Sequence, residues 1–288
     1  MPAANLAPLP GAPAAAPAPP PPDVWTPDEI AAGLRQCLRL LAPVSADIEL
    51  QDPMKHAQCG TPAPLLLHSV GAVDKIEFAP APLLNCGLAA SLSEWVEKVL
   101  QPAAKEMLGS RIKRIVGASS YSCRNIYNNP KLSLSEHATG NAVDIVGFVT
   151  ADGRTILVAK GWGPTERDIA AAKKKVAEAK DAAAKKKGAK TADSEPTPSI
   201  EEAGKKSDAK QKGRLHKTDF KRETDKPAQV ASVGEIGAAT TKEAAFLKRL
   251  HGGSCRVFAT VLGPEANEAH RDHFHLDMKV RSSHAVCH

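Results

Sequence analysis

The sequence predicts an α+β fold, with a small and mostly antiparallel sheet flanked by helices. Stretches with helical spacing of apolar residues and short strand-like stretches both occur, but they do not alternate strictly as in a doubly wound α/β protein. Six cysteines are dispersed along the chain, and two segments have a strongly biased composition. Without those segments roughly 200 residues remain, which is enough for one compact core.

The chain starts with a Pro/Ala-rich segment, residues 1–24. Nine of the first 22 residues are proline and none is charged. Such a composition favours extended, polyproline-like conformations and cannot bury a core. We therefore expect a disordered tether or spacer here.

The first helix is predicted by a capping box, Thr26-Pro27-Asp28-Glu29, with Pro at the first helical position and Glu at the third. Pro43 ends the helix. The apolar residues between them follow helical spacing: Ile30, Leu34, Cys37, Leu38 and Leu41.

Short strands are expected next, at residues 48–50, 65–67 and 75–78. A long helix should then cover residues 83–108, because apolar residues recur at helical spacing from Leu84 to Val99. Pro102 lies inside it and predicts a kink or a break into two helices.

A strand over residues 112–116 follows, and residues 142–149 have the continuous apolar character of a buried strand. Ala151-Asp152-Gly153-Arg154 is a hairpin turn signal. Residues 155–159 should return as the partner strand.

A Lys/Ala-rich insert covers residues 166–226. It holds 18 Lys and Arg residues against 12 Asp and Glu residues, whereas the rest of the chain holds 20 of each. Residues 168–187 predict a solvated helix, and the remainder predicts disorder. The insert is either a plain solvated insertion or a segment attracted to an anionic polymer. No nucleic acid partner is expected, because no aromatic residues interleave with the lysines.

The chain then resumes with a helix near residues 241–250 and two strand-like stretches, 256–262 and 273–280. Long insertions in surface loops cost little stability, so the flanking halves can share one sheet. We therefore predict a single domain built from residues 25–165 and 227–288.

The cysteines form no CxxC pair, and an even, dispersed set indicates three disulfides in an oxidising compartment. The alternative is six free thiols in the cytosol. The sequence contains no apolar run of about 18 residues, so no membrane span is predicted. No signal peptide is visible, but the predicted disulfides make the periplasm or the cell envelope the expected location. Six cysteines allow 15 pairings; our expectation is Cys37–Cys59, Cys86–Cys123 and Cys255–Cys287.

Several histidines lie in two short regions of the sequence. His270, His273 and His275 lie within HRDHFHLD, and His137 precedes Asp144 by seven positions. Gly140 lies between His137 and Asp144, where we expect a tight turn. In a strand, period-two geometry puts His273 and His275 on one face.

Two histidines and one carboxylate form a common catalytic zinc set that leaves a fourth position to water. The candidate ligands are therefore His137, Asp144 and His275. The plain alternative is an exposed histidine pair and an aspartate that caps a turn.

The stretch SEHATGNAVD, residues 135–144, resembles the SxHxxGxAxD motif of the LAS zinc peptidases, which include D-alanyl-D-alanine carboxypeptidases, MepA-type murein endopeptidases and the Hedgehog amino-terminal domain. The ending His270-x-x-His273-x-His275 resembles that of the murein endopeptidases. The stretches SYSCRN, LSEHATGNAVDI, TVLGP and HRDHFHLD resemble the bacterial extensin-like C-terminal domain family even more closely. The resemblance covers about residues 36–162 and 245–287.

The resemblance implies a LAS/Hedgehog-type domain in which one zinc ion is bound by His137, Asp144 and His275. It implies that His273 is the general base or a transition-state stabiliser and that His270 is an additional active-site histidine. Arg124 corresponds to an arginine near the cleaved carbonyl. Ser135 would not bind the metal but would orient the loop or one of the ligands. Asp272 and Asp277 would either fix histidine tautomers or lie at the surface.

The function implied is zinc-dependent hydrolysis of peptide bonds in peptidoglycan by a monomer. LAS carboxypeptidases have Glu where this chain has His273, which favours endopeptidase-like activity. One alternative is a non-catalytic wall-binding or structural module that keeps the metal for stability. The other is a scaffold whose basic insert binds an anionic partner.

Overall fold

The computed structural model describes residues 23–72, 74–189, 241–282 and 284–288. The described residues form two compact units, one from residues 23–163 and 241–288 and one that begins at Pro164. The predicted disorder of residues 1–22 and 190–226 lies outside the described residues, and the domain boundaries stay a prediction.

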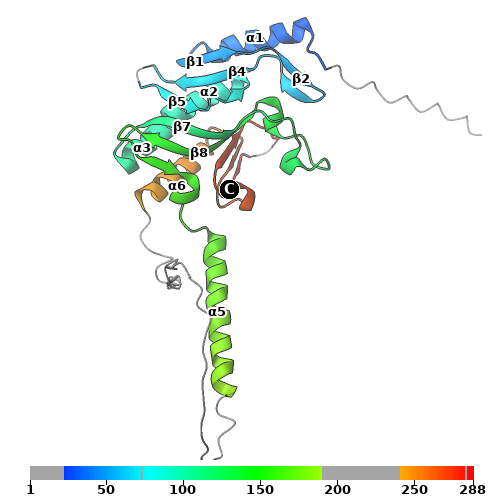
Figure 1. The fold of residues 1–288 in the computed structure, drawn as a ribbon. Coiled ribbons are helices and arrows are strands. Elements are labelled where there is room, and N and C mark those ends of the chain that lie inside the picture. The colour runs from blue at the N-terminus through cyan, green and yellow to red at the C-terminus, as the bar shows by residue number, and fades with distance from the viewer. Residues whose placement is uncertain (1–22, 73, 190–240, 283) are drawn as a thin grey trace, which may run out of the picture. The chain divides into compact units, whose positions relative to one another are not determined.

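The larger unit contains one mixed sheet in the order β1-β4-β5-β7-β8-β11-β10-β12, in which β6 also pairs with β4 and β9 with β8 (Figure 1). β2 and β3 form a separate two-stranded sheet. The strands are β1 (Ala46–Leu50), β2 (Met54–His56), β3 (Cys59–Thr61), β4 (Leu65–Val70), β5 (Ile76–Ala79), β6 (Leu83–Leu84), β7 (Ile112–Ser119), β8 (Ala142–Thr150), β9 (Thr155–Leu157), β10 (Thr260–Leu262), β11 (Phe274–Asp277) and β12 (Val286–Cys287).

Helices and single helical turns connect these strands. The helices are α1 (Pro27–Leu41), α2 (Cys86–Trp95), α3 (Gln101–Leu108), α4 (Val158–Gly161), α5 (Glu166–Ala189) and α6 (Lys242–Ser254). The shorter turns are η1 (Val96–Leu100), which is a π-helix, and three 3-10 turns, η2 (Ile126–Asn128), η3 (Glu136–Thr139) and η4 (Glu268–His270).

The α+β class is confirmed, but the expectation of a small sheet is wrong, and most but not all of its strand pairs are antiparallel. The sheet is large and mixed, since β5 pairs with β7 and β10 pairs with β12 in parallel. Parallel neighbours need a crossover connection. The helices α2 and α3 lie between β5 and β7 in the chain and supply that crossover.

The first helix begins as predicted. Glu29 N donates to Thr26 Oγ1, and Thr26 N donates to Glu29 Oε2 at 2.8 Å, which completes the capping box. Only part of its apolar side is covered, because α1 packs mainly on α2. Cys37 is buried, whereas Leu38 is 69% exposed.

The long helix predicted over residues 83–108 is interrupted. Leu83 and Leu84 form β6 instead, and Asn85 caps α2 by accepting from Leu88 N at 2.9 Å. The break comes just before Pro102, which lacks the N–H of a regular α-helical turn. The chain widens there into η1, with Gln101 N donating to Val96 O.

Four predicted elements have different lengths in the structure. Residues 158–159 belong to α4 and not to the partner strand. The last two predicted strands are shorter in the structure, where they form β10 and β11, and His273 lies just before β11. The last helix, α6, extends beyond residue 250 to Ser254. The structure confirms five predicted strands and one predicted helix. They are residues 48–50 (β1), 65–67 (β4), 75–78 (β5), 112–116 (β7), 142–149 (β8) and 168–187 (α5).

The core lies where the sheet meets α2, α3 and α6. Phe148 on β8 packs edge-to-face on Phe246 of α6, with ring centroids 5.6 Å apart. The indole of Trp95 donates to Ser254 Oγ at 2.8 Å, which ties the end of α2 to the end of α6. Helix α6 also contacts α4, where Gly161 leaves room for the side chain of Leu247.

Three disulfides link segments that are distant in sequence. Cys255–Cys287 joins α6 to β12 as expected, but the other two expected pairs are wrong. Helix α1 packs on the start of α2, so Cys37 meets Cys86, and the pair Cys59–Cys123 joins β3 to the loop after β7.

Among the described helices, none combines the length with the apolar character that crossing a bilayer requires. Three disulfides are consistent with an extracellular or envelope protein, because such bonds persist in oxidising compartments.

Replacing Cys37 and Cys86 together by Ser should lower the free energy of unfolding by about 2–5 kcal/mol, because the unfolded chain regains the entropy of a long loop. Urea denaturation measures this loss. A non-reducing peptide map that joins Cys37 to Cys59 would contradict the pairing.

Candidate metal centre

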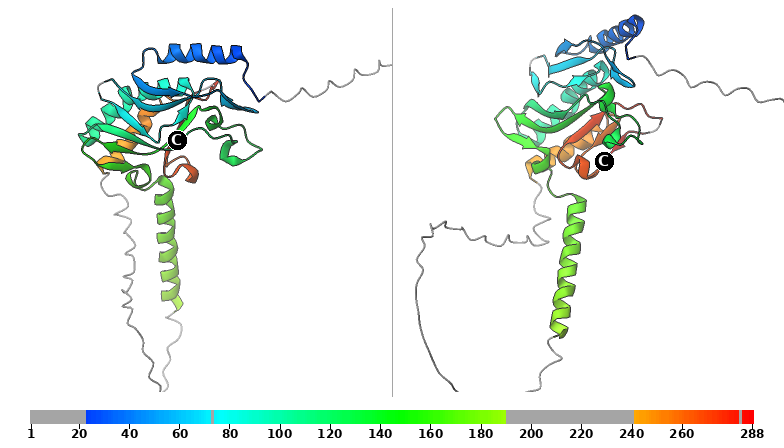
Figure 2. Two further views of the ribbon diagram at one scale, coloured as in Figure 1. Left: turned by 45° about the horizontal axis from the view of Figure 1, so that its top comes forward. Right: turned by 45° about the vertical axis from the view of Figure 1, so that its right-hand side comes forward.

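The pairing of β8 with β11 brings two candidate ligands together. The strands are antiparallel, and Asp144 and His275 are register partners although 131 positions separate them. Side chains of such partners lie on the same face of a sheet. Figures 1 and 2 show the C-terminal strands lying beside β8.

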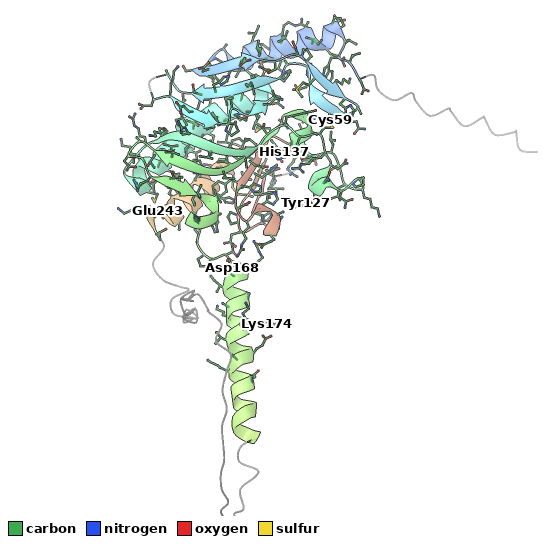
Figure 3. The ribbon with its side chains drawn as sticks, viewed as in Figure 1. Cys59, Tyr127, His137, Asp168, Lys174 and Glu243 are labelled. Atoms are coloured by element: carbon green, nitrogen blue, oxygen red, sulfur yellow. A yellow bond between two sulfur atoms is a disulfide. The ribbon has the colours of Figure 1, made fainter. Side chains whose placement is uncertain are left out.

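The third candidate ligand, His137, comes from η3, the single turn that precedes β8 (Figure 3). Ser135 caps this turn by accepting from His137 N. Gly140 ends it with a φ of +63°, and a Cβ there would lie 3.0 Å from Asn85 N. The tight turn expected at Gly140 is confirmed, since a left-handed conformation in contact with another backbone favours glycine.

Three ligand atoms converge at the centre of this site. His137 Nε2 lies 3.2 Å from His275 Nδ1 and 3.3 Å from Asp144 Oδ1, and His275 Nδ1 lies 3.0 Å from Asp144 Oδ1. A tetrahedral zinc ion with bonds of about 2.0–2.1 Å holds its ligand atoms about 3.3 Å apart. The triangle therefore has the size of one face of such a site.

The outer contacts of the two imidazoles fix where their protons lie. His137 Nδ1 contacts the carbonyl oxygen of Ser120, which can only accept, so Nδ1 donates and Nε2 keeps its lone pair. His275 Nε2 lies 3.1 Å from Asp277 Oδ2, so Nε2 donates and Nδ1 keeps its lone pair. In their neutral forms both imidazoles thus direct a lone pair at the carboxylate of Asp144.

Three acceptors this close need a cation among them. In the metal-free chain a proton fills that role. Burial opposes ionisation of His275, but hydrogen bonds to Asp144 and Asp277 outweigh it and raise its pKa to about 9. Burial likewise opposes the charge on Asp144, but hydrogen bonds with His137 and His275 hold its pKa below the usual range.

His273 lies at the edge of the triangle. Its Nε2 is 3.7 Å from Asp144 Oδ1, and its Nδ1 lies 2.8 Å from Asp272 Oδ1. Nδ1 therefore donates to the carboxylate of Asp272, which leaves Nε2 with a lone pair on the side of the site.

His270 ends η4 and is largely buried. Its Nδ1 lies 2.9 Å from Asn267 Oδ1, and its ring centroid lies 5.8 Å from that of His275. Burial, reinforced by the nearby His275 and His273, lowers the pKa of His270 to about 4. His270 is thus neutral at physiological pH.

A cavity of about 510 Å³ opens over the triangle. Arg124 lines it from the loop after β7, which Cys123 ties to β3. The structure thus gathers all six candidate site residues at one cavity: Arg124, His137, Asp144, His270, His273 and His275.

Four further residues line or support the site. Asp277 is buried and contacts His275, in agreement with the tautomer-fixing alternative weighed from the sequence. Tyr127, Lys279 and Arg281 line the cavity but were not singled out in the sequence. Only the position of the last two shortly after the HRDHFHLD stretch could have pointed to them.

A second group of metal-type ligands, His251, Cys255 and Cys287, lies elsewhere in the described part of the chain. The two cysteines form a disulfide and offer no thiolate. The donor set around Asp144 is therefore the one that fits an ion.

Comparison with models of protein families matches residues 35–184 and 223–288 to the C-terminus of extensin-like proteins. The match includes the first 19 residues of the predicted insert, 166–184, and leaves residues 185–222 out. Searches among curated proteins and among solved structures gave no significant match.

Gly140→Ala should lower the free energy of unfolding by about 1–3 kcal/mol, because it combines left-handed strain with close contact to the backbone at Asn85. Thermal or urea denaturation measures the change. Gly109→Ala is the matched control, because Gly109 has nearly the same φ, +67°, but nothing lies within 4 Å of an added Cβ. Equal losses in the two variants would contradict the role of the Asn85 contact.

The stability of the metal-free protein should fall between about pH 6.5 and pH 9. The pKa of His275 is raised on folding from 6.5 to about 9. The stabilisation is therefore complete below pH 6.5 and disappears as the pH rises through 9, with about 3 kcal/mol as its upper limit. Urea denaturation in the presence of a chelator across this range tests it. An unchanged midpoint would show that no proton is shared within the triangle.

Proposed function

The chain belongs to the family of extensin-like protein C-terminal domains, and on this premise we propose that it is a zinc-dependent hydrolase of the bacterial cell envelope that cleaves peptide bonds in peptidoglycan. The observation that carries the proposal is the triangle of His137, Asp144 and His275, whose lone pairs and carboxylate face one point beneath an open cavity. The likeness of residues 135–144 to the LAS zinc peptidase motif adds the expectation of a LAS-type fold.

Zinc fits the donor set, because two imidazoles and one carboxylate are ligands it prefers. His137, Asp144 and His275 would hold it, and the contacts of the two histidines with Ser120 O and Asp277 fix the required tautomers. When bound, the ion supplies Lewis-acid polarisation of the amide carbonyl and of the attacking water.

His273 is placed to move the protons. Asp272 holds its Nδ1–H, so Nε2 can take a proton from the attacking water and then deliver it to the leaving amine. Histidine is the side chain that most often serves as a general acid or base.

Two further side chains complete the proposed active site. The guanidinium of Arg124 lines the same cavity and would stabilise the negative charge that develops on the carbonyl oxygen. His270 stays neutral, and with Nδ1–H donated to Asn267 its Nε2 can accept a hydrogen bond from the substrate.

The proposed location is the periplasm or the cell envelope, because the chain has three disulfides and its proposed substrate is a wall polymer. The proposed active form is the monomer, since Arg124 and the five other candidate residues all come from one chain.

The test separates metal binding from chemistry. His137→Ala and Asp144→Ala should lose both zinc and muropeptide release, because each removes a ligand. His273→Ala should keep zinc but lose about 10²–10⁴-fold in cleavage rate, which is typical for a missing general base. Metal content is measured by mass spectrometry of the purified full chain, and products by chromatography of digested sacculi.

His68→Ala is the matched control, because His68 lies on β4, is exposed and does not line the cavity. It should keep both zinc and cleavage. A zinc-loaded wild-type protein that binds sacculi but releases no peptide would contradict the hydrolase and favour the non-catalytic wall module.

A further inference from the structure

We infer that the cavity recognises a free carboxylate on the substrate, and that Arg281 is the residue that binds it. This inference rests on the proposed function for the identity of the substrate but stands on different residues. Arg281 lies after β11, outside the predicted ligand and proton-transfer residues.

Apart from the histidines, six side chains that line the cavity are charged, three basic and three acidic: Arg124, Lys279, Arg281, Glu136, Asp144 and Asp277. The acidic groups are already engaged. Asp144 and Asp277 contact the histidines, and Glu136 pairs with Lys279 at 3.3 Å. Among the described residues, neither Arg124 nor Arg281 forms an ion pair with a carboxylate.

Arg281 is held in place by a neutral group. Its Nη2 donates to Thr260 Oγ1 at 2.7 Å, and Thr260 is 4% exposed. Thr260 lies on β10 directly opposite Asp277, the residue that supports His275. The guanidinium is therefore anchored beside the proposed metal centre while its charge stays uncompensated.

A guanidinium carries five N–H donors in one plane and can bind both oxygens of a carboxylate. The contact with Thr260 uses only one donor. The planar shape makes Arg281 better suited to a carboxylate than a lysine in the same place.

The balance of charge in the cavity points the same way. The three basic and three acidic side chains cancel, and a bound divalent ion would leave an excess of two positive charges. An anionic substrate group reduces that excess. Because Arg124 is placed for the carbonyl being cleaved, Arg281 remains for a second, permanently charged group.

The substrate class that follows is a peptide with a free carboxylate close to the scissile amide. Cross-links between stem peptides can carry such a group on the residue next to the cleaved bond. Arg281 is then a specificity-determining residue that favours substrates with this group free over substrates with it blocked.

The test compares cross-linked stem-peptide dimers with their carboxylates free and the same dimers with these groups converted to amides. The full-length wild-type protein should prefer the free acid by roughly ten- to a hundredfold in kcat/KM, mainly through KM. Arg281→Gln should remove the preference, and Arg281→Lys should retain part of it. Arg35→Gln, an exposed change on α1, is the control and should keep the preference intact.

Equilibrium binding of both peptides to the chelator-treated protein, measured by calorimetry, gives a readout that needs no cleavage. If the wild type binds the free acid more tightly and Arg281→Gln removes this preference, carboxylate recognition is supported. If the zinc-loaded protein also shows no turnover, the proposed hydrolase is refuted. Equal binding of both peptides by the wild type would overturn the inference, even with active enzyme. An Arg281→Gln variant that weakens the binding of both peptides by the same factor would also overturn the inference.

Discussion

The antiparallel pairing of β8 with β11 is the contact on which the rest of the structure depends. It sets Asp144 opposite His275, and it joins the parts of the chain that lie before and after the long insert. A buried carboxylate is tolerated there because two imidazoles contact it. Without this register the carboxylate would lose the imidazole of His275, so the pairing of these strands also assembles the site.

Neighbouring polar groups hold the side chains of His137 and His275 in place. Ser120 O and Asp277 contact the far nitrogens of the two histidines, and Lys279 N donates to Asp277 Oδ1 at 3.0 Å. Each of these partners is supplied by a strand, β7 or β11, or by a residue adjoining it. Every buried side-chain nitrogen or oxygen of the described residues has a hydrogen-bond partner. A rigid support of this kind is what a preorganised metal site requires.

Features set by neighbouring residues could be predicted from the sequence. The capping box of α1 and the turn at Gly140 depend on local chemistry, and the motif around His137 and Asp144 located the candidate ligands. Features set by distant parts of the chain could not. The partner of Cys37 depends on where α1 packs, and the parallel pairing of β5 and β7 depends on the path of the crossover. The role proposed for Arg281 depends on the position of Thr260 in space. The ligand function itself remains a prediction.

The contact between α4 and α6 has a practical consequence for anyone who wishes to modify this protein. These helices flank the stretch from Pro164 to Ala239, and the fit of Leu247 against Gly161 keeps their adjoining ends together. Since the ends are already close, the entropy of closing a loop between them changes only slowly with its length. The position should accept a foreign sequence, such as a fluorescent reporter, in exchange for the native stretch while leaving the strands on either side paired.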